Sequence, residues 1–200
     1  MKKQSNVAYI LRISLTLLLI TGVVAVLLAG VNMITKDRIA AITKEKTEKA
    51  VAEVMPYYCQ NPTEIEFSDD TGLVKKAYRS EKYFYGCIPF EGDFWAYDYA
   101  VEVVPSGFDG EITMMVGVDR NGKVTGISII SHTETAGLGA IAAANNAKGE
   151  AFRKQFVGMS GQLAVSKDGG EVDAITGATI TSRAVTEGVN AALACVDNFG

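Results

Sequence analysis

The sequence predicts an α+β domain, a central antiparallel sheet with packed helices, preceded by one N-terminal transmembrane helix. Three observations support this fold class. An uncharged apolar run of 23 residues, Ile13 to Thr35, lies near the N-terminus. Two β-rich runs flank the pair Asn121-Gly122 at the centre of the chain. An apolar pattern with helical spacing lies near the C-terminus.

The apolar run between Arg12 and Lys36 is long enough to span a bilayer. As a helix it would measure about 34 Å at ~1.5 Å per residue, against a hydrocarbon core of ~30 Å. It exceeds the roughly 7–15 apolar residues of a cleaved signal peptide, and no clean small-x-small site closes it. We therefore expect a retained single-pass anchor. Basic residues flank it on both sides, so counting them leaves its orientation open.

After the anchor, a helical stalk is predicted over 36–54, where apolar residues alternate with charges and Pro56 follows the end. The segment 59–95 is rich in Asp, Gly and aromatic residues and predicts no regular element. The predicted organisation is therefore an N-terminal tail and anchor, a helical stalk and a globular domain, with bounds 1–35, 36–56 and 57–200.

Strands are predicted over 96–105, 111–119 and 123–131. The last two flank Arg120-Asn121-Gly122, and Asn-Gly between two β-rich runs is a strong signal of a hairpin. The segment 140–156 has helical composition and is expected to break at Gly149.

The C-terminal run from Arg183 to Phe199 predicts a helix with one apolar face. That face needs a partner, and the sheet is the expected one. The face is formed by Ala184, Val185, Gly188, Val189, Ala192, Leu193 and Val196.

Charge and cysteine content exclude several classes of function. Residues 35–200 hold 16 Lys and Arg against 23 Asp and Glu, a net charge of −7, which disfavours a partner such as nucleic acid. The three cysteines lack CxxC spacing and His132 is the only histidine, so no metal site is predicted. Cys59 and Cys87 could form a disulfide or remain buried free thiols; the sequence leaves both open.

Two loops carry candidate chemistry, and the first is DAITGATITS at 173–182. Thr181 or Ser182 would suit the N-cap of the last helix, and Gly177 with Ala178 leaves the backbone accessible to a ligand. The start of a helix also favours an anionic group. A simple capped helix explains the same residues.

The second loop is HTETAGLGA at 132–140, which follows the hairpin. Gly137 and Gly139 allow tight turns, and Leu138 between them could lie flat against a planar ring or plug the core. His132 and Glu134 are two residues apart, which is too little evidence for a catalytic dyad.

Taken together, the two loops resemble a known family. D-x-x-T-G-A-T-x-T at 173–181 resembles the flavinylation motif of bacterial membrane FMN-binding proteins, and H-T-E-T-A-G-L-G at 132–139 resembles their second hallmark. The chain is most similar to the G subunits of Rnf ion-translocating ferredoxin:NAD⁺ oxidoreductase complexes, over most of 10–195. The C subunits of Na⁺-translocating NADH:quinone oxidoreductases share this domain.

The resemblance implies FMN attached through its phosphate to the hydroxyl of the last threonine in the motif, which is Thr181. Thr176 stands where the family often has Ser, which keeps the hydroxyl. Ala136 stands where it often has Pro, which loosens the turn but leaves Gly137-Leu138-Gly139 intact. The other cofactor-binding positions it implies are His132, Glu134, Thr135, Gly137, Leu138, Gly139, Asp173, Thr176, Gly177, Ala178 and Thr179.

The resemblance further implies an electron-transfer subunit in a membrane complex that couples ferredoxin oxidation and NAD⁺ reduction to Na⁺ or H⁺ translocation. No residue of the chain would be catalytic during turnover, since the flavin supplies the redox chemistry. Implied partners are the other membrane and peripheral subunits, membrane lipid, and a flavin transferase that uses FAD during maturation. The N-terminus would be cytoplasmic and the FMN domain would lie on the outer face.

Two other classes remain as alternatives. The chain could be a C-type quinone-reductase subunit or a stand-alone extracytoplasmic FMN carrier, although its short loops argue against the larger quinone-reductase subunit. A non-redox membrane-anchored sensor or scaffold would carry no covalent flavin.

The uncharged anchor offers no ionisable group for an ion pathway, so ion movement is expected in partner subunits.

Overall fold

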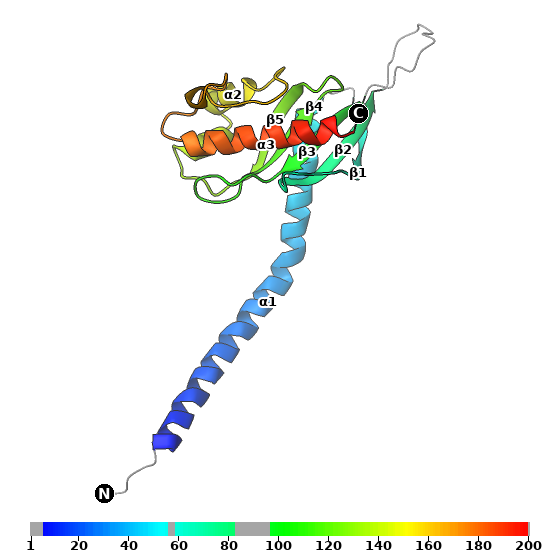
Figure 1. The fold of residues 1–200 in the computed structure, drawn as a ribbon. Coiled ribbons are helices and arrows are strands. Elements are labelled where there is room, and N and C mark those ends of the chain that lie inside the picture. The colour runs from blue at the N-terminus through cyan, green and yellow to red at the C-terminus, as the bar shows by residue number, and fades with distance from the viewer. Residues whose placement is uncertain (1–5, 56–58, 83–96, 200) are drawn as a thin grey trace, which may run out of the picture. The chain divides into compact units, whose positions relative to one another are not determined.

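The computed structural model describes residues 6–55, 59–82 and 97–199. Its strands and helices follow one another along the chain in the order shown in Figure 1. They are α1 (Asn6–Val54), β1 (Cys59–Ile65), β2 (Val74–Lys82), β3 (Tyr97–Val103), β4 (Thr113–Val118), β5 (Val124–Ser131), the 3₁₀ helix η1 (Gly139–Ala143), α2 (Ala147–Lys154), the 3₁₀ helix η2 (Ser166–Asp168) and α3 (Thr179–Asp197).

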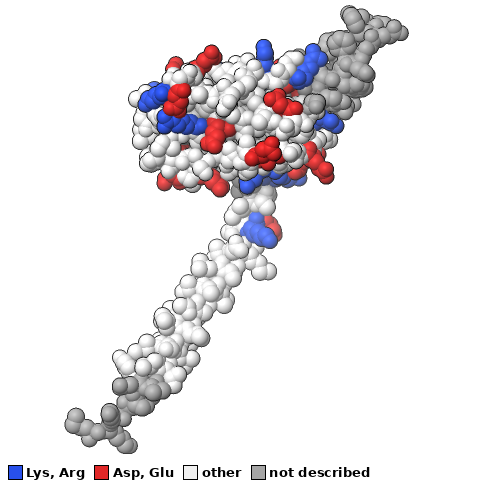
Figure 2. Space-filling view, in the orientation of Figure 1, with Lys and Arg blue, Asp and Glu red and all other residues white. Residues whose placement is uncertain are grey.

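Helix α1 covers both the predicted anchor and the predicted stalk without a break, which confirms the helical prediction for both. By length and composition, it is the one helix of the described residues able to cross a membrane. Its apolar stretch presents exposed side chains such as Leu18 and Leu27, and Figure 2 shows this stretch uncharged. The chain divides into two compact units, Met1–Glu45 and Lys46–Gly200.

The five strands form one antiparallel sheet in the order β1-β2-β3-β4-β5, which confirms the α+β prediction. The predicted hairpin joins β4 to β5. At its turn the Asp119 carboxylate accepts hydrogen bonds from the backbone N–H groups of Asn121 (2.8 Å) and Lys123 (2.9 Å). Gly122 adopts φ +68°, the left-handed conformation that this turn requires.

The prediction of no regular element over 59–95 is wrong for β1 and β2, which pair with Thr63 opposite Arg79. The sequence signal is weak because the buried positions of β2 include the small Ala77 and Ser80, while charged residues fill most positions around them. Residues 83–96 lie outside the described part of the chain, and so does Cys87 of the possible Cys59–Cys87 disulfide.

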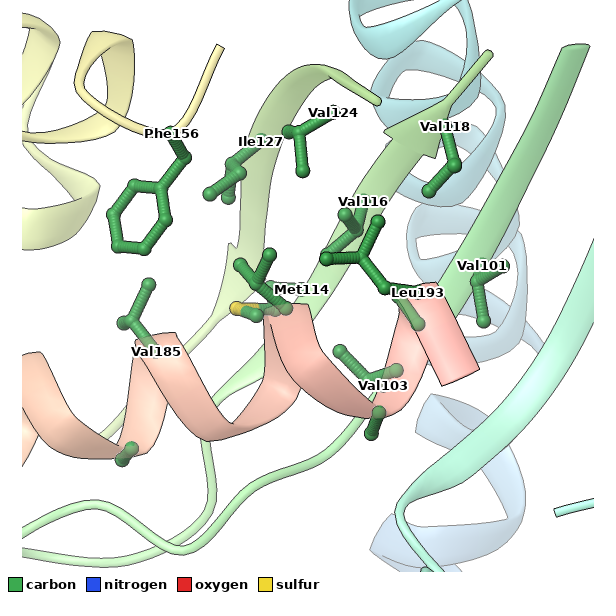
Figure 3. Packing of buried hydrophobic residues seen from close by; sticks show 14 of the residues in the cluster. Val101, Val103, Met114, Val116, Val118, Val124, Ile127, Phe156, Val185 and Leu193 are labelled. Atoms are coloured by element: carbon green, nitrogen blue, oxygen red, sulfur yellow. The ribbon is translucent and has the colours of Figure 1, made fainter. Parts of the chain in front are cut away.

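Helix α3 packs its apolar face on the sheet, as the sequence predicts. In Figure 3, Val185 of α3 points toward Phe156 and Leu193 of α3 points toward Val116 of β4, all in one buried cluster. Each fully buried side chain of this size contributes roughly 1.5–3 kcal/mol by leaving water. Burying this face therefore fixes the position of α3 across the sheet.

The other face of the sheet is covered by the last turns of α1, within the second compact unit. Neighbouring β4 residues show the alternation, since Met114 packs with α3 whereas Met115 packs with Val51 and Val54 of α1. The Thr125 hydroxyl donates to the Val54 carbonyl at 2.7 Å. The end of α1 is thus part of the domain core.

The break predicted at Gly149 lies elsewhere. Residues 144–146 separate η1 from α2, and Gly149 is a buried residue within α2. The Asn146 side chain caps α2 by accepting hydrogen bonds from the N–H groups of Lys148 (3.1 Å) and Gly149 (3.0 Å). Capping by Asn146, which the helical composition of 140–156 does not predict, decides the boundary.

Candidate functional site

Helix α3 begins at Thr179, with Ala178 as its N-cap and no side-chain capping bond. The predicted cap at Thr181 or Ser182 is therefore wrong, because both residues lie inside the helix and are buried. The Ser182 hydroxyl donates to the Ala178 carbonyl at 2.9 Å and accepts from the Ile175 N–H at 3.0 Å. It holds the preceding loop against the helix.

Glu134 connects three segments of the chain. Its carboxylate is buried, and Oε1 accepts hydrogen bonds from the backbone N–H groups of Phe108 (2.7 Å) and Asp109 (3.3 Å). Oε2 accepts from the Thr181 hydroxyl at 2.6 Å. Thr181 is only 1% exposed. A charge-assisted hydrogen bond of this kind fixes both side chains.

Glycines make this close packing possible. A Cβ at Gly139 would lie 2.5 Å from the Thr181 hydroxyl oxygen, so a side chain there would displace the Glu134–Thr181 bond. Gly177 adopts φ +80°, and a Cβ there would lie 3.1 Å from Leu138 Cδ2. The structure therefore brings the two loops together, at the start of α3.

The solvent side of the site presents different groups. Thr176 and Gly177 are exposed, and the half-buried Thr179 accepts a hydrogen bond on its hydroxyl from Lys167 Nζ at 2.9 Å. Leu138 is 44% exposed, which rules out the interpretation that it plugs the core. An accessible hydroxyl, a cation and an apolar side chain thus lie around one loop.

Lys167 belongs to η2, which is held to α3 by an ion pair. Arg183 Nε and Nη2 donate to Asp168 Oδ2 and Oδ1 at 2.7 and 2.6 Å. These hydrogen bonds lower the pKa of Asp168 and raise the pKa of Arg183. None of these three charged residues is predicted from the sequence, because no local pattern signals a pair 15 residues apart.

The remaining predicted residues shape the loops or lie beside them. The Thr135 carbonyl accepts from the N–H groups of Leu138 and Ala140, both at 3.2 Å, which shapes the turn that contains Gly137. Asp173 is exposed, and its backbone pairs with the Gln155 side chain. His132 is half-buried; its Nδ1 atom has no hydrogen-bond partner among the described residues.

Cysteine and metal chemistry have little support in the described part of the chain. Cys195 is a free thiol buried in α3, and burial raises its pKa to about 11. Among residues 6–55, 59–82 and 97–199, no three His, Cys, Asp or Glu side chains gather as a candidate metal site.

Both loops fall within the residues, 107–194, that match the family model described as an FMN-binding domain. The domain is therefore of the FMN-binding class. The G subunit of the Na⁺-translocating ferredoxin:NAD⁺ oxidoreductase complex of Acetobacterium woodii is 30% identical, over 99% of this chain and 97% of that protein. The chain belongs to the family of G subunits of ion-translocating oxidoreductase complexes, which confirms the resemblance seen in the sequence.

Two further relatives agree. The G subunit of the ion-translocating oxidoreductase complex of Methanosarcina acetivorans is 29% identical over 92% of this chain and 93% of that protein. The G subunit of the proton-translocating ferredoxin:NAD⁺ oxidoreductase complex of Clostridium ljungdahlii is 44% identical over 50% of this chain and 54% of that protein. Members of the family thus carry names with different coupling ions.

Proposed function

We propose that this chain is the electron-carrying G subunit of a membrane complex that couples electron transfer from ferredoxin to NAD⁺ to the movement of Na⁺ or H⁺. The observation that carries the proposal is the Thr181–Glu134 contact between the two loops, inside the matched FMN-binding region. Bound FMN would supply one- and two-electron chemistry, while the chain supplies attachment, orientation and electrostatics.

Thr181 is the proposed attachment residue, at the last threonine of the motif. Its hydroxyl donates to the Glu134 carboxylate at 2.6 Å, so its oxygen is held in one orientation. Its burial means that attachment would require the segment from Gly137 to Gly139 to move aside. Glycine at both ends of that segment gives the backbone the conformational freedom that such a movement needs.

Thr179 is the competing hydroxyl of the same loop. It is half-buried, and it accepts from Lys167 Nζ at 2.9 Å. It is the more accessible oxygen, but no acceptor for its proton is seen among the described residues. We therefore keep Thr181 as the acceptor and assign Thr179 and Lys167 to the binding of the cofactor.

The surrounding residues fit a flavin phosphoester. The first turn of α3, which has 19 residues, offers backbone N–H donors and the positive end of the helix dipole to a phosphate. The Lys167 ammonium adds a positive charge beside that turn. The exposed Leu138 side chain beside Gly177 offers an apolar contact to the cofactor.

Attachment would take place once, during maturation by a separate flavin transferase. The Thr181 oxygen would attack the FMN phosphorus of FAD, forming a phosphoester bond while the pyrophosphate bond breaks and AMP leaves. In turnover the chain would need no acid, base or nucleophile of its own.

Membrane placement and partners follow from the same proposal. Helix α1 would anchor the chain in the lipid of the cell membrane, with the N-terminus cytoplasmic and residues 57–200 on the outer face. Residues 1–35 would form the tail and anchor, and 36–56 the stalk. Ion movement would occur in the other subunits of the complex, because the apolar stretch of α1 has no ionisable side chain.

Co-expression tests this function. The full chain, made with and without a flavin transferase, should gain the mass of FMN less water only with the transferase. In its host, a tagged copy should co-purify with membrane subunits that oxidise ferredoxin. An unmodified mass under both conditions would refute the covalent attachment of FMN to this chain. Purification without redox subunits would favour a stand-alone carrier.

A further inference from the structure

The Thr181 hydroxyl makes a different hydrogen bond from the other buried hydroxyls of α3. Ser182 donates to the Ala178 carbonyl at 2.9 Å and Thr186 donates to the Ser182 carbonyl at 2.8 Å, both four residues back along the helix. That is the usual partner for a hydroxyl inside a helix. Thr181 instead donates to a carboxylate 47 residues away.

The carboxylate is held so that one oxygen faces Thr181. Glu134 Oε1 accepts the backbone N–H groups of Phe108 and Asp109. Oε2 has Thr181 as its only hydrogen-bond partner among the described residues. Because backbone groups fix Oε1, the other oxygen stays directed at the hydroxyl proton.

A neutral hydroxyl is a weak nucleophile, and an adjacent base activates it. A base must lie within about 2.6–3.2 Å of the oxygen whose proton it takes. The Oγ1–Oε2 distance of 2.6 Å meets this requirement. Glu134 is also shielded from water, which preserves the contact until the transferase acts.

We propose that Glu134 is the base of flavin attachment: its Oε2 takes the Thr181 proton as Thr181 Oγ1 attacks the FMN phosphorus of FAD. The new bond is Oγ1–P, the broken bond joins that phosphorus to the bridging oxygen, and AMP leaves with the electron pair. The proton on Glu134 then passes to solvent through the opening left when the segment from Gly137 to Gly139 moves aside. This inference rests on the proposed function, and it assigns the chain an active part in its own maturation.

Transferase kinetics with the full chain as substrate test the role. Glu134→Gln keeps the size and the Oε1 acceptor, and it should lower kcat about 100-fold with KM for the chain within about twofold. Glu134→Asp keeps a carboxylate, so its kcat should be at least tenfold higher than that of Glu134→Gln. Glu150→Gln, at an exposed glutamate of α2, is the control and should react at the wild-type rate.

Several outcomes would overturn the inference. The first is a wild-type kcat in Glu134→Gln. The second is a kcat of Glu134→Asp no higher than that of Glu134→Gln. The third is an effect of Glu134→Gln on KM alone. A wild-type chain that never gains FMN would instead refute the proposed function. Near-UV circular dichroism of each variant shows whether the fold is kept.

A measurement on the wild type remains if Glu134→Gln does not fold. Attachment removes the hydroxyl proton that Glu134 Oε2 accepts, so the carboxyl ¹³C resonance of Glu134 should shift between the flavin-free and loaded chains. The Glu150 resonance should stay in place. An unchanged Glu134 resonance would overturn the inference.

Discussion

At the scale of single residues, the site depends on one buried carboxylate. Glu134 accepts two backbone N–H groups and the Thr181 hydroxyl, so its charge is well compensated despite burial. The position in the motif identified Glu134 as a site residue. Its partners could not be predicted, since Phe108 and Asp109 lie 26 and 25 residues away in the chain.

Glu134→Ala should lower the free energy of unfolding by about 1–3 kcal/mol, because it leaves two N–H groups and a hydroxyl without a partner. Urea denaturation of the full chain in detergent measures this. Glu150→Ala is the control, as Glu150 is exposed and only pairs with Lys154 at 3.4 Å. Equal losses in the two variants would contradict the structural role of Glu134.

The Asp168–Arg183 pair makes a prediction about pH. Arg183 hydrogen bonds lower the pKa of Asp168 from 3.8. A lowered folded-state pKa means that the pair stabilises the fold above the unfolded pKa, and that this contribution is lost as pH falls through the folded pKa. Carboxyl ¹³C NMR should therefore show Asp168 titrating below 3.8.

The matched variant is Arg183→Gln, which should raise the Asp168 pKa toward its ordinary value. Arg120→Gln, at an exposed arginine of the hairpin turn, should leave it unchanged. If Asp168 titrates at the same pH with and without Arg183, the ion pair does not form in solution and the anchoring of η2 would need another explanation.

At the scale of elements, periodic segments could be predicted and locally capped ones could not. The hairpin and the apolar face of α3 follow from alternation and from helical spacing, which burial on one face imposes. The strand β2 is not predicted, because small and charged residues hide its alternation. The predicted start of α3 is wrong because Thr181 and Ser182, residue types that favour the N-cap, instead bond to Glu134 and Ala178.

Gly149 in α2 illustrates packing that overrides propensity. Alanine usually stabilises a helix by about 1 kcal/mol relative to glycine. Here a Cβ would lie 2.6 Å from the Ile141 carbonyl oxygen, a backbone atom that cannot move aside easily. Gly149→Ala should therefore destabilise the domain by about 1–3 kcal/mol, as measured by urea denaturation of the full chain.

Lys148→Ala, at the exposed neighbouring position of the same helix, is the control and should change stability by less than about 0.5 kcal/mol. If Gly149→Ala is instead as stable as the wild type or more stable, the close approach of η1 to α2 in the structure is incorrect.

At the scale of the whole molecule, the chain consists of one long apolar helix and one α+β domain that contains both motif loops. Composition alone predicts the membrane helix, and the paired motifs predict the family. Neither predicts the surroundings of each threonine, because these depend on how the first turn of α3 packs against Glu134. That packing buries Thr181 and leaves Thr179 facing Lys167.

Membrane attachment should fail when the centre of the anchor is charged. Val24→Arg is expected to cost about 2.5–3.5 kcal/mol of insertion free energy and to lower the fraction of chain that resists carbonate extraction. Val24→Leu should be retained like the wild type. If Val24→Arg is retained equally, the segment is not the main membrane attachment.

The most direct test of the central claim is to locate the flavin on the wild-type chain by mass spectrometry. Trypsin releases residues 168–183, which contain both candidate threonines, and fragmentation distinguishes Thr181 from Thr179. We predict FMN on Thr181, retained in Thr181→Ser and in Thr179→Ala, and absent from Thr181→Ala. FMN on Thr179 in the wild type, or a loaded Thr181→Ala chain, would contradict the account.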